Sequence, residues 1–256
     1  MLELKNISKT FNAGTVNQKV ALNGLNLTMN EGDFVTVIGG NGAGKSTMLN
    51  AIAGVFPVDT GKILIDGVDV TALPEYKRAK YIGRVFQDPM MGTAATMQIE
   101  ENLALAARRG KPRTLRLGIT KADRAFYREQ LQILDLGLEE RMTTKVGLLS
   151  GGQRQALTLL MATLQQPKLL LLDEHTAALD PGAAEKVMAL TKKIVEENKI
   201  TTLMITHDME YALEYGSRTI MLDSGKIVMD LTGKEREEMT TGKLAELFYG
   251  KAHKRG

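Results

Sequence analysis

The chain has 256 residues, with 33 Lys and Arg against 30 Asp and Glu, so its formal net charge is +3. A charge this small, spread along the chain, does not indicate a nucleic-acid partner. The sequence contains no cysteine, which excludes disulfides, cysteine-ligated metal sites and thiol catalysis. Its apolar runs fall short of the ~20 residues that a bilayer-spanning helix needs, and its first residues show no export signal. We therefore expect a cytoplasmic protein that does not cross a membrane.

The first third of the chain predicts two kinds of strand. Apolar residues alternate with polar ones over residues 2–4 and 25–29, which is typical of strands with one exposed face. Residues 62–68 predict an antiparallel hairpin with Asp66-Gly67 at its turn. Residues 34–38 form a continuous apolar run instead, which favours a strand covered on both faces.

Helices and buried strands alternate over much of the remaining chain. Helical spacing and end signals predict helices over residues 45–53 before Gly54, 150–165 before Pro167, and 183–198. Continuous apolar runs at 168–172 and 200–205 predict two more buried strands. Because strands that alternate with helices are typical of crossover connections, we expect an α/β fold with a parallel core.

Residues 88–148 interrupt this alternation, because 98–108 and 121–136 both have a helical pattern with no strand between them. We interpret this stretch as an inserted helical subdomain. The expected boundaries, within a single domain over residues 1–250, are an α/β core with its antiparallel portion at about 1–87 and 155–230, a helical subdomain at about 88–154, and a basic tail at 251–256.

A glycine-rich loop lies between the strand at 34–38 and the helix at 45–53. Its sequence, Gly39-Gly40-Asn41-Gly42-Ala43-Gly44-Lys45-Ser46-Thr47, has the spacing of a phosphate-binding loop. Glycines allow backbone N–H groups to surround phosphate oxygens, and the helix N-terminus adds a partial positive charge. Lys45 would reach the β- and γ-phosphates, and Ser46 would ligate Mg²⁺. The loop therefore predicts a phosphate-loop NTPase.

Two adjacent carboxylates end the buried strand at 168–172. A nucleotide-bound Mg²⁺ needs a carboxylate at the end of a neighbouring strand, and Asp173 supplies one. Successive side chains of a strand point to opposite sides, so Glu174 could orient or deprotonate the attacking water. The alternative is a solvated turn, which the phosphate loop in the same chain makes the weaker interpretation.

The pentapeptide Leu149-Ser150-Gly151-Gly152-Gln153 resembles the signature motif of ATP-binding cassette (ABC) ATPases. Ser150 is a suitable helix N-cap, and the two glycines expose backbone N–H groups that can face an anion. An ordinary capped helix would explain Ser150 but not the pentapeptide. The resemblance covers nearly the whole chain, with the motifs in the family's order, and implies a RecA-like phosphate-loop core.

The resemblance also implies roles for four further residues. Phe11 matches the aromatic position on which adenine stacks, and Gln87 matches the Q-loop glutamine, which bridges Mg²⁺ and the attacking water. Asp180 matches the D-loop, which meets the partner subunit, and His207 matches the switch histidine, which contacts the γ-phosphate. Taken singly, these positions would also suit a core aromatic, a surface amide or a satisfied polar group.

The resemblance further implies a head-to-tail dimer, formed by two identical chains or by two similar cassettes. The phosphate loop of one chain and Ser150–Gln153 of the other would enclose each ATP, so that hydrolysis opens the dimer. The implied role is import through a separate integral-membrane permease, with this chain peripheral on the inner face of the cell membrane and a separate solute-binding protein in the system. Residues 85–93 and 99–103 resemble a branch that serves amino-acid uptake, including aromatic amino acids.

Two other functions stay open on the sequence. A single cassette of similar length can serve soluble partners, as in iron–sulfur cluster assembly. A non-catalytic nucleotide-binding scaffold is a third class, and the presence of Gln87, Glu174 and His207 together disfavours it.

Three positions depart from the pattern that the family commonly shows. His175 stands where many relatives have proline after the acid pair, and Ala156 and Met161 stand where many have arginines after the signature motif. The expected catalytic residues are unaffected by these changes. In addition, basic residues concentrate over 108–124, which fits either a solvated loop or a surface near anionic lipid headgroups.

Overall fold

The computed structural model describes residues 1–111 and 118–252. The chain divides into two compact units, one formed by Met1–Arg78 and Ile200–Gly256 and the other by Ala79–Lys199. Among the described residues, none of the helices combines the length and apolar character needed to cross a bilayer. Of the expected basic tail, residues 251 and 252 end a helix, and 253–256 lie outside the described residues.

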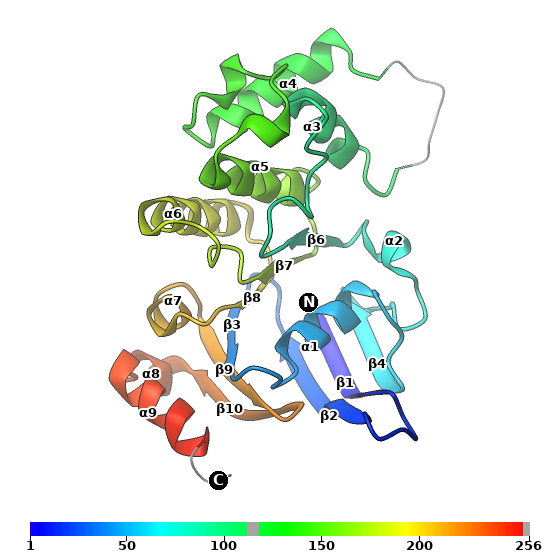
Figure 1. The fold of residues 1–256 in the computed structure, drawn as a ribbon, viewed down its shortest axis with the longest axis vertical. Helices are drawn as coiled ribbons and strands as arrows, with labels where there is room; N and C mark the ends of the chain where they lie inside the picture. Colours follow the sequence, from blue (N-terminus) through cyan, green and yellow to red (C-terminus); the bar gives the residue numbers. More distant parts are fainter. Residues whose placement is uncertain (112–117, 253–256) are drawn as a thin grey trace. The chain divides into compact units, whose positions relative to one another are not determined.

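The first unit contains an antiparallel sheet with the strand order β2-β1-β4-β5 (Figure 1). Its strands are β1 (Leu2–Phe11), β2 (Lys19–Met29), β4 (Thr60–Ile65) and β5 (Val68–Asp69). Asp66 and Gly67 both have positive φ, at 52° and 76°, as the tight turn of a two-residue hairpin requires. The hairpin predicted over 62–68 is therefore confirmed.

The first unit also contains strands with a parallel arrangement around β3 (Phe34–Gly39), which is buried along its whole length. β3 pairs in parallel with β8 (Thr202–Ile205) and with β9 (Arg218–Asp223), while β10 (Lys226–Thr232) is antiparallel to β9. The strands predicted at 34–38 and 200–205 are confirmed. Their continuous apolar pattern has the expected cause, because both faces are covered.

Five helices of the first unit fall within the described residues: α1 (Lys45–Ala53), α2 (Glu75–Arg78), α7 (Met209–Glu214), α8 (Gly233–Glu237) and α9 (Thr241–Ala252). Helix α1 ends at Gly54, as predicted, with φ at 84°. The buried guanidinium of Arg78 donates to the carbonyls of Ala51 and Ile52 at 2.8 Å each, so it satisfies the C-terminal end of α1. Leu244 of α9 and Ile38 of β3 belong to one buried apolar cluster of the same unit.

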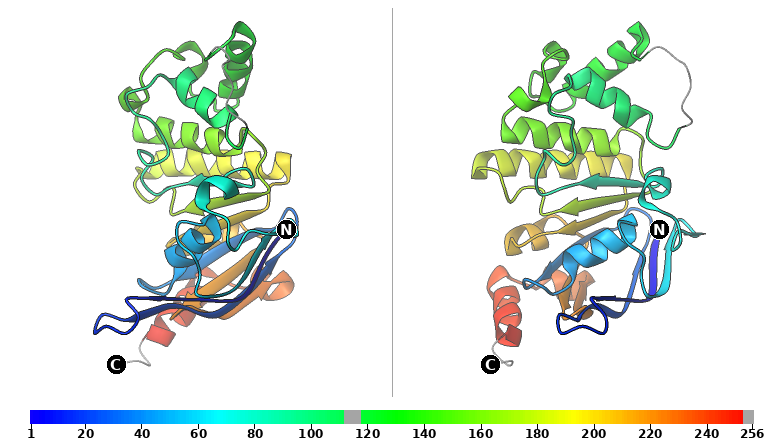
Figure 2. Two further views of the ribbon diagram at one scale, coloured as in Figure 1. Left: turned by 90° about the vertical axis from the view of Figure 1, so that its right-hand side faces the viewer. Right: turned by 45° about the vertical axis from the view of Figure 1, so that its right-hand side comes forward.

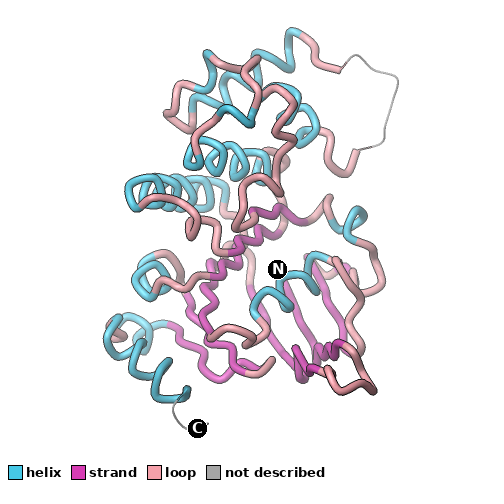
Figure 3. The backbone as a smooth tube through the Cα atoms, in the orientation of Figure 1, coloured by secondary structure: helices cyan, strands magenta, loops and turns pink. Residues whose placement is uncertain are grey.

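The second unit pairs two parallel strands, β6 (Ile82–Val85) and β7 (Leu169–Asp173), with a group of helices (Figure 3). The helices are α3 (Ile99–Ala107), α4 (Lys121–Gln132), α5 (Gly151–Thr163) and α6 (Pro181–Asn198), with short 3₁₀ turns at Leu138–Glu140 and Val146–Leu148. All four helices were predicted from the sequence, and both views of Figure 2 place α5 beside α6.

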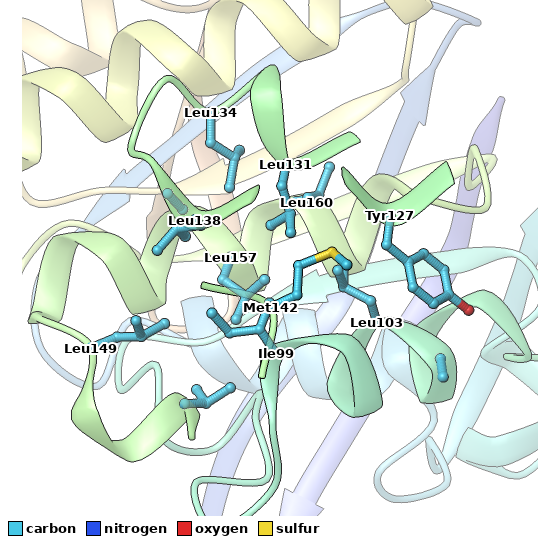
Figure 4. Packing of buried hydrophobic residues seen from close by; sticks show 13 residues of the cluster. Ile99, Leu103, Tyr127, Leu131, Leu134, Leu138, Met142, Leu149, Leu157 and Leu160 are labelled. Atoms are coloured by element: carbon cyan, nitrogen blue, oxygen red, sulfur yellow. The ribbon is translucent and has the colours of Figure 1, made fainter. Parts of the chain in front are cut away.

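The helical part of the second unit has its own apolar core. Side chains of α3, α4 and α5 meet there, including Leu103, Tyr127 and Leu157, each of which is almost completely buried (Figure 4). Capping boxes at Thr120 and Ser150 fix where α4 and α5 begin. This core holds the N-terminus of α5, and with it the signature-like pentapeptide.

Candidate functional site

The phosphate-loop sequence forms the predicted connection between β3 and α1. Lys45, at the start of α1, is buried, and its Nζ donates to the carbonyls of Gly39 and Gly40 at 2.7 and 3.2 Å. Gly44 caps α1 without any side-chain hydrogen bond, so backbone N–H groups rather than a capping side chain define this helix start. Ser46 and Asn41 are exposed and Thr47 is half-buried. The arrangement offers donors and a cation to an anion.

Two glycines of this loop are required by close packing. A Cβ on Gly39 would lie 2.5 Å from the Leu222 carbonyl oxygen, and a Cβ on Gly44 would lie 2.5 Å from the Ala21 carbonyl oxygen. Gly44 also has φ at 106°, which L side chains rarely adopt. The close packing of Gly39 and Gly44 against these carbonyls thus helps to fix the shape of the loop, in which Gly42 is exposed.

His207 lies at the same sheet edge as the phosphate loop. In the parallel pair of β3 and β8, Val37 lies opposite Ile205, and the Thr206 N–H donates to the Val37 carbonyl at 3.2 Å. Gly39 and His207 each follow two residues later, so both leave the carboxyl end of the sheet, where ligands of such folds bind. His207 is exposed there.

Phe11 ends β1 in an aromatic pair that the sequence did not indicate. Its half-buried ring meets the ring of Phe56 edge-on, with 5.3 Å between the centroids. Lys9 Nζ lies 5.6 Å from each of the two centroids and forms an ion pair with Asp59 at 2.9 Å. Phe11 is therefore held from one side by Phe56 and Lys9, which orients its ring.

A further cation lies beside the phosphate loop. Lys19 is the register partner of Phe11 across β1 and β2, so the two side chains share one face of the hairpin. A Cβ on Gly42 would lie 3.4 Å from Lys19 Nζ. Lys19 thus connects the aromatic position with the phosphate loop, a neighbourhood set by strand register that spacing along the chain could not reveal.

In the second unit, Gln87 and Glu174 repeat the same geometry. Val85 of β6 lies opposite Leu172 of β7 in a parallel pair, and each candidate residue follows two positions later. Both therefore leave the carboxyl edge of their strand pair. Glu174 has φ at 48°, a left-handed conformation that is strained for a residue with a side chain.

Asp173 ends β7 with its carboxylate partly exposed. Its Oδ2 lies 3.8 Å from Arg84 Nη2, a long ion pair, and the Arg84 guanidinium also lies 4.5 Å from the centre of the Phe86 ring. Carboxylate, hydroxyl and amide oxygens are the hard ligands that Mg²⁺ prefers, so the chemistry of Asp173, Ser46 and Gln87 fits this ion. Arg84 was missed in the sequence because a basic residue inside a short strand has no motif.

The signature-like residues and Asp180 are brought together in the second unit. Ser150 accepts a hydrogen bond from the Gln153 N–H, and Asp180 accepts one from the Ala183 N–H, so each caps a helix. Ser150, Gly152, Gln153 and Asp180 line one pocket of about 440 Å³. The N-termini of α5 and α6 therefore open toward the same space.

Two buried polar residues behind the acid pair were missed or left unexplained. Gln155 of α5 donates from Nε2 to the carbonyls of Phe86 and His175, at 3.1 and 2.6 Å. The His175 ring lies 3.2 Å from the hydroxyl of Thr191, which itself donates to the Val187 carbonyl, so His175 Nε2 is the donor between them. Burial lowers the pKa of His175 to about 4. His175 is thus a neutral packing residue.

The other departures from the family pattern also have structural reasons. Ala156 is buried in the core of the helical part, and Met161 packs against that core. Within the basic stretch, Arg109 donates to the Ala162 carbonyl at 2.8 Å, and Arg124 pairs with the buried Glu100 at 2.8 Å. These two arginines serve internal contacts, and residues 112–117 of the same stretch lie outside the described residues.

Comparison with known proteins gives consistent matches. Residues 22–177 match the ABC transporter family. A tyrosine transport ATP-binding protein of Clostridioides difficile (strain R20291) is 44% identical over 248 residues, which cover 97% of this chain and 98% of that protein. A phosphonates import ATP-binding protein of Shouchella clausii (strain KSM-K16) is 34% identical over 97% of this chain and 91% of its own length.

The solved structures include a dimeric post-hydrolysis state of the ATP-binding cassette MJ0796 bound to ADP and Pi. It has a TM-score of 0.78 and 32% identity, and the match covers 91% of this chain and 98% of that one. The fold and the phosphate loop thus define an α/β phosphate-loop ATPase. The chain belongs to the ABC transporter family and is an ATP-hydrolysing cassette of it.

Proposed function

We propose that the chain is the ATPase subunit of an ABC importer and that the imported solute is an aromatic amino acid of the tyrosine type. The observation that carries the substrate class is the 44% identity to a tyrosine transport protein over 97% of the chain. In this role the chain lies at the inner face of the membrane, bound to a permease, and a separate solute-binding protein delivers the solute.

The proposed ATP contacts are made by Phe11, the phosphate loop and three candidate Mg²⁺ ligands. Phe11 stacks on adenine, the N–H groups of residues 39–47 surround the phosphates, and Lys45 leaves its carbonyl partners to meet the β- and γ-phosphate oxygens. Ser46, Asp173 and Gln87 would hold the Mg²⁺ that accompanies ATP. That ion would supply neutralisation of phosphate charge during the transfer.

Hydrolysis is assigned to groups at the carboxyl ends of the strands. The carboxylate of Glu174 accepts the proton of the attacking water, while the amide of Gln87 orients that water. His207 donates a hydrogen bond to the γ-phosphate. In the proposed work stroke, two cassettes close around two ATP molecules, and Ser150–Gln153 of each cassette contact the γ-phosphate of the ATP bound to the other. The two cassettes separate once hydrolysis removes the γ-phosphates.

The pairing of Ser150–Gln153 with Asp180 around one pocket supports this dimer, because both segments would then face the second cassette together. The role with soluble partners has no observation in its favour, so import is the function proposed.

The test is uptake of labelled tyrosine by cells that lack the chromosomal gene and carry a plasmid copy. The unchanged chain and Glu185→Gln, a control that alters an exposed carboxylate of α6, should both restore uptake. Glu174→Gln should not. An excess of unlabelled phenylalanine should compete, and methionine or a phosphonate should not. Tyrosine uptake that is independent of this gene would refute the substrate, and competition by a phosphonate alone would replace it.

A further inference from the structure

Gln155 is a completely buried residue of α5, the helix that begins in the signature-like pentapeptide and is called the signature helix below. It lies about one and a half turns after the Ser150 cap. Its Nε2 reaches two backbone carbonyls that belong to different segments, Phe86 at 3.1 Å and His175 at 2.6 Å. Only an amide or another donor fits here, because an oxygen in the same place would face two carbonyl oxygens. The orientation of the amide is thereby fixed.

The two carbonyls lie next to the two candidate catalytic residues of this unit. Phe86 directly precedes Gln87, and His175 directly follows Glu174. A single side chain therefore ties together the segments that carry the water-orienting amide and the general base. The tie reaches them through the backbone, so it sets where these residues lie and not their chemistry.

Glu174 needs such a constraint because its backbone is strained. With φ at 48°, its conformation persists only where the surroundings hold it in place. The Ala177 N–H donates to the Glu174 carbonyl at 3.0 Å, and the His175 ring is fixed by Thr191. The bond from Gln155 to the His175 carbonyl is the shortest of these contacts and the one that comes from α5.

The Gln155 amide also has an energetic cost, which comes from its oxygen atom. Its Oε1 is buried and has no hydrogen-bond partner among the described residues. A methionine or leucine would remove that oxygen, but it would leave the carbonyls of Phe86 and His175 without the donor that Gln155 supplies. The two donated bonds must therefore offset that cost.

We propose that Gln155 is a positioning residue for ATP hydrolysis, which fixes the positions of Gln87 and Glu174 relative to the signature helix. A shift of α5 when its N-terminus meets an anion is then passed directly to both catalytic segments. This inference rests on the proposed roles of Gln87 and Glu174.

The test compares steady-state ATP hydrolysis by the full chain and by two variants. Gln155→Met keeps the length and removes both donors, and Gln155→Asn keeps the amide but is too short to reach both carbonyls. Each should lower kcat at least tenfold and leave KM for ATP within about threefold. The matched control is Thr163→Val, because Thr163 is a buried polar residue of the same helix whose hydroxyl donates to the carbonyls of Leu159 and Leu160 within α5.

Thermal unfolding of each variant, with the control as the reference, separates positioning from stability. Near-normal melting temperatures combined with the loss of kcat support the inference. If one of the two Gln155 variants does not fold, the result of the other variant decides. Activity of both variants within twofold of Thr163→Val, or a change confined to KM, overturns it. If the unchanged chain hydrolyses no ATP, or Glu174→Gln does not reduce hydrolysis, the proposed function fails instead.

Discussion

Phe11 presents a half-buried ring whose orientation is set by Phe56 and Lys9. Stacking of a base on an aromatic ring stabilises binding by about 1–3 kcal/mol. Phe11→Ala should therefore raise the dissociation constant for ATP about tenfold, whereas Phe11→Tyr should keep the affinity. Equilibrium binding of a fluorescent ATP analogue measures both. Phe126→Ala, which removes an exposed aromatic of α4, is the control, and an unchanged affinity of Phe11→Ala would remove Phe11 from the site.

His175 gives the stability of the protein a defined pH dependence. Burial lowers its pKa to about 4 from the usual 6.5, so the unfolded chain binds more protons between these values. The stability that the protein has with a neutral His175 is therefore fully present above pH 6.5 and is lost as the pH falls toward 4. Between pH 8 and pH 5 the free energy of unfolding should fall by about 2 kcal/mol from this group. Urea unfolding of the unchanged chain and of His175→Gln at both pH values checks this, since the variant should lack that part of the fall.

At the residue scale, the sequence predicted those positions whose role is tied to a local motif. Lys45 and Ser46 follow a strand and begin a helix, so spacing alone defined them. Gln155 and Lys19 could not be found in this way. Their contacts depend on which strand or loop packs against them, and a glutamine in a helix or a lysine in an edge strand normally faces solvent.

Arg78 shows how one side chain stabilises an element from outside it. Besides the two carbonyls at the end of α1, its guanidinium donates to the carbonyls of Leu73 and Thr71 at 2.8 and 2.9 Å. Arg78→Met would leave two buried and two half-buried carbonyl acceptors without this donor, so the free energy of unfolding should fall by about 3–5 kcal/mol. Denaturant unfolding measures it. Lys77→Met, at the exposed neighbouring position, should change stability by less than about 0.5 kcal/mol, and equal effects of the two would contradict the capping role.

Among the secondary-structure elements, helices with clear end signals were predicted best. Gly54 and the glycines before Lys45 mark both ends of α1, and Pro167 follows α5. Helices α2, α7, α8 and α9 were not predicted. Helix α9 depends on Leu244, which joins the buried cluster that contains Ile38, and no local pattern links residues more than 200 positions apart.

In the molecule as a whole, two features relate the fold to the proposed ATP hydrolysis: the ends of the parallel strands and the pocket at the starts of α5 and α6. In each unit, two candidate residues leave the carboxyl edge of a parallel strand pair, Gly39 with His207 and Gln87 with Glu174. In the second unit, Ser150–Gln153 and Asp180 open toward one pocket. The class of fold and the family were predictable because these segments carry local motifs. The solute had only a resemblance over residues 85–93 and 99–103 to indicate it, and the substrate class stays a proposal that rests on a relative.

We propose that ATP holds two copies of this chain together and that hydrolysis, with Glu174 as the general base, separates them. The most direct measurement is the molar mass of Glu174→Gln by light scattering, with and without Mg²⁺ and ATP. We expect a monomer without nucleotide, a dimer of twice that mass with ATP, and a return to the monomer when ADP replaces ATP. A variant that binds ATP and keeps the mass of one chain would show that ATP does not join two chains.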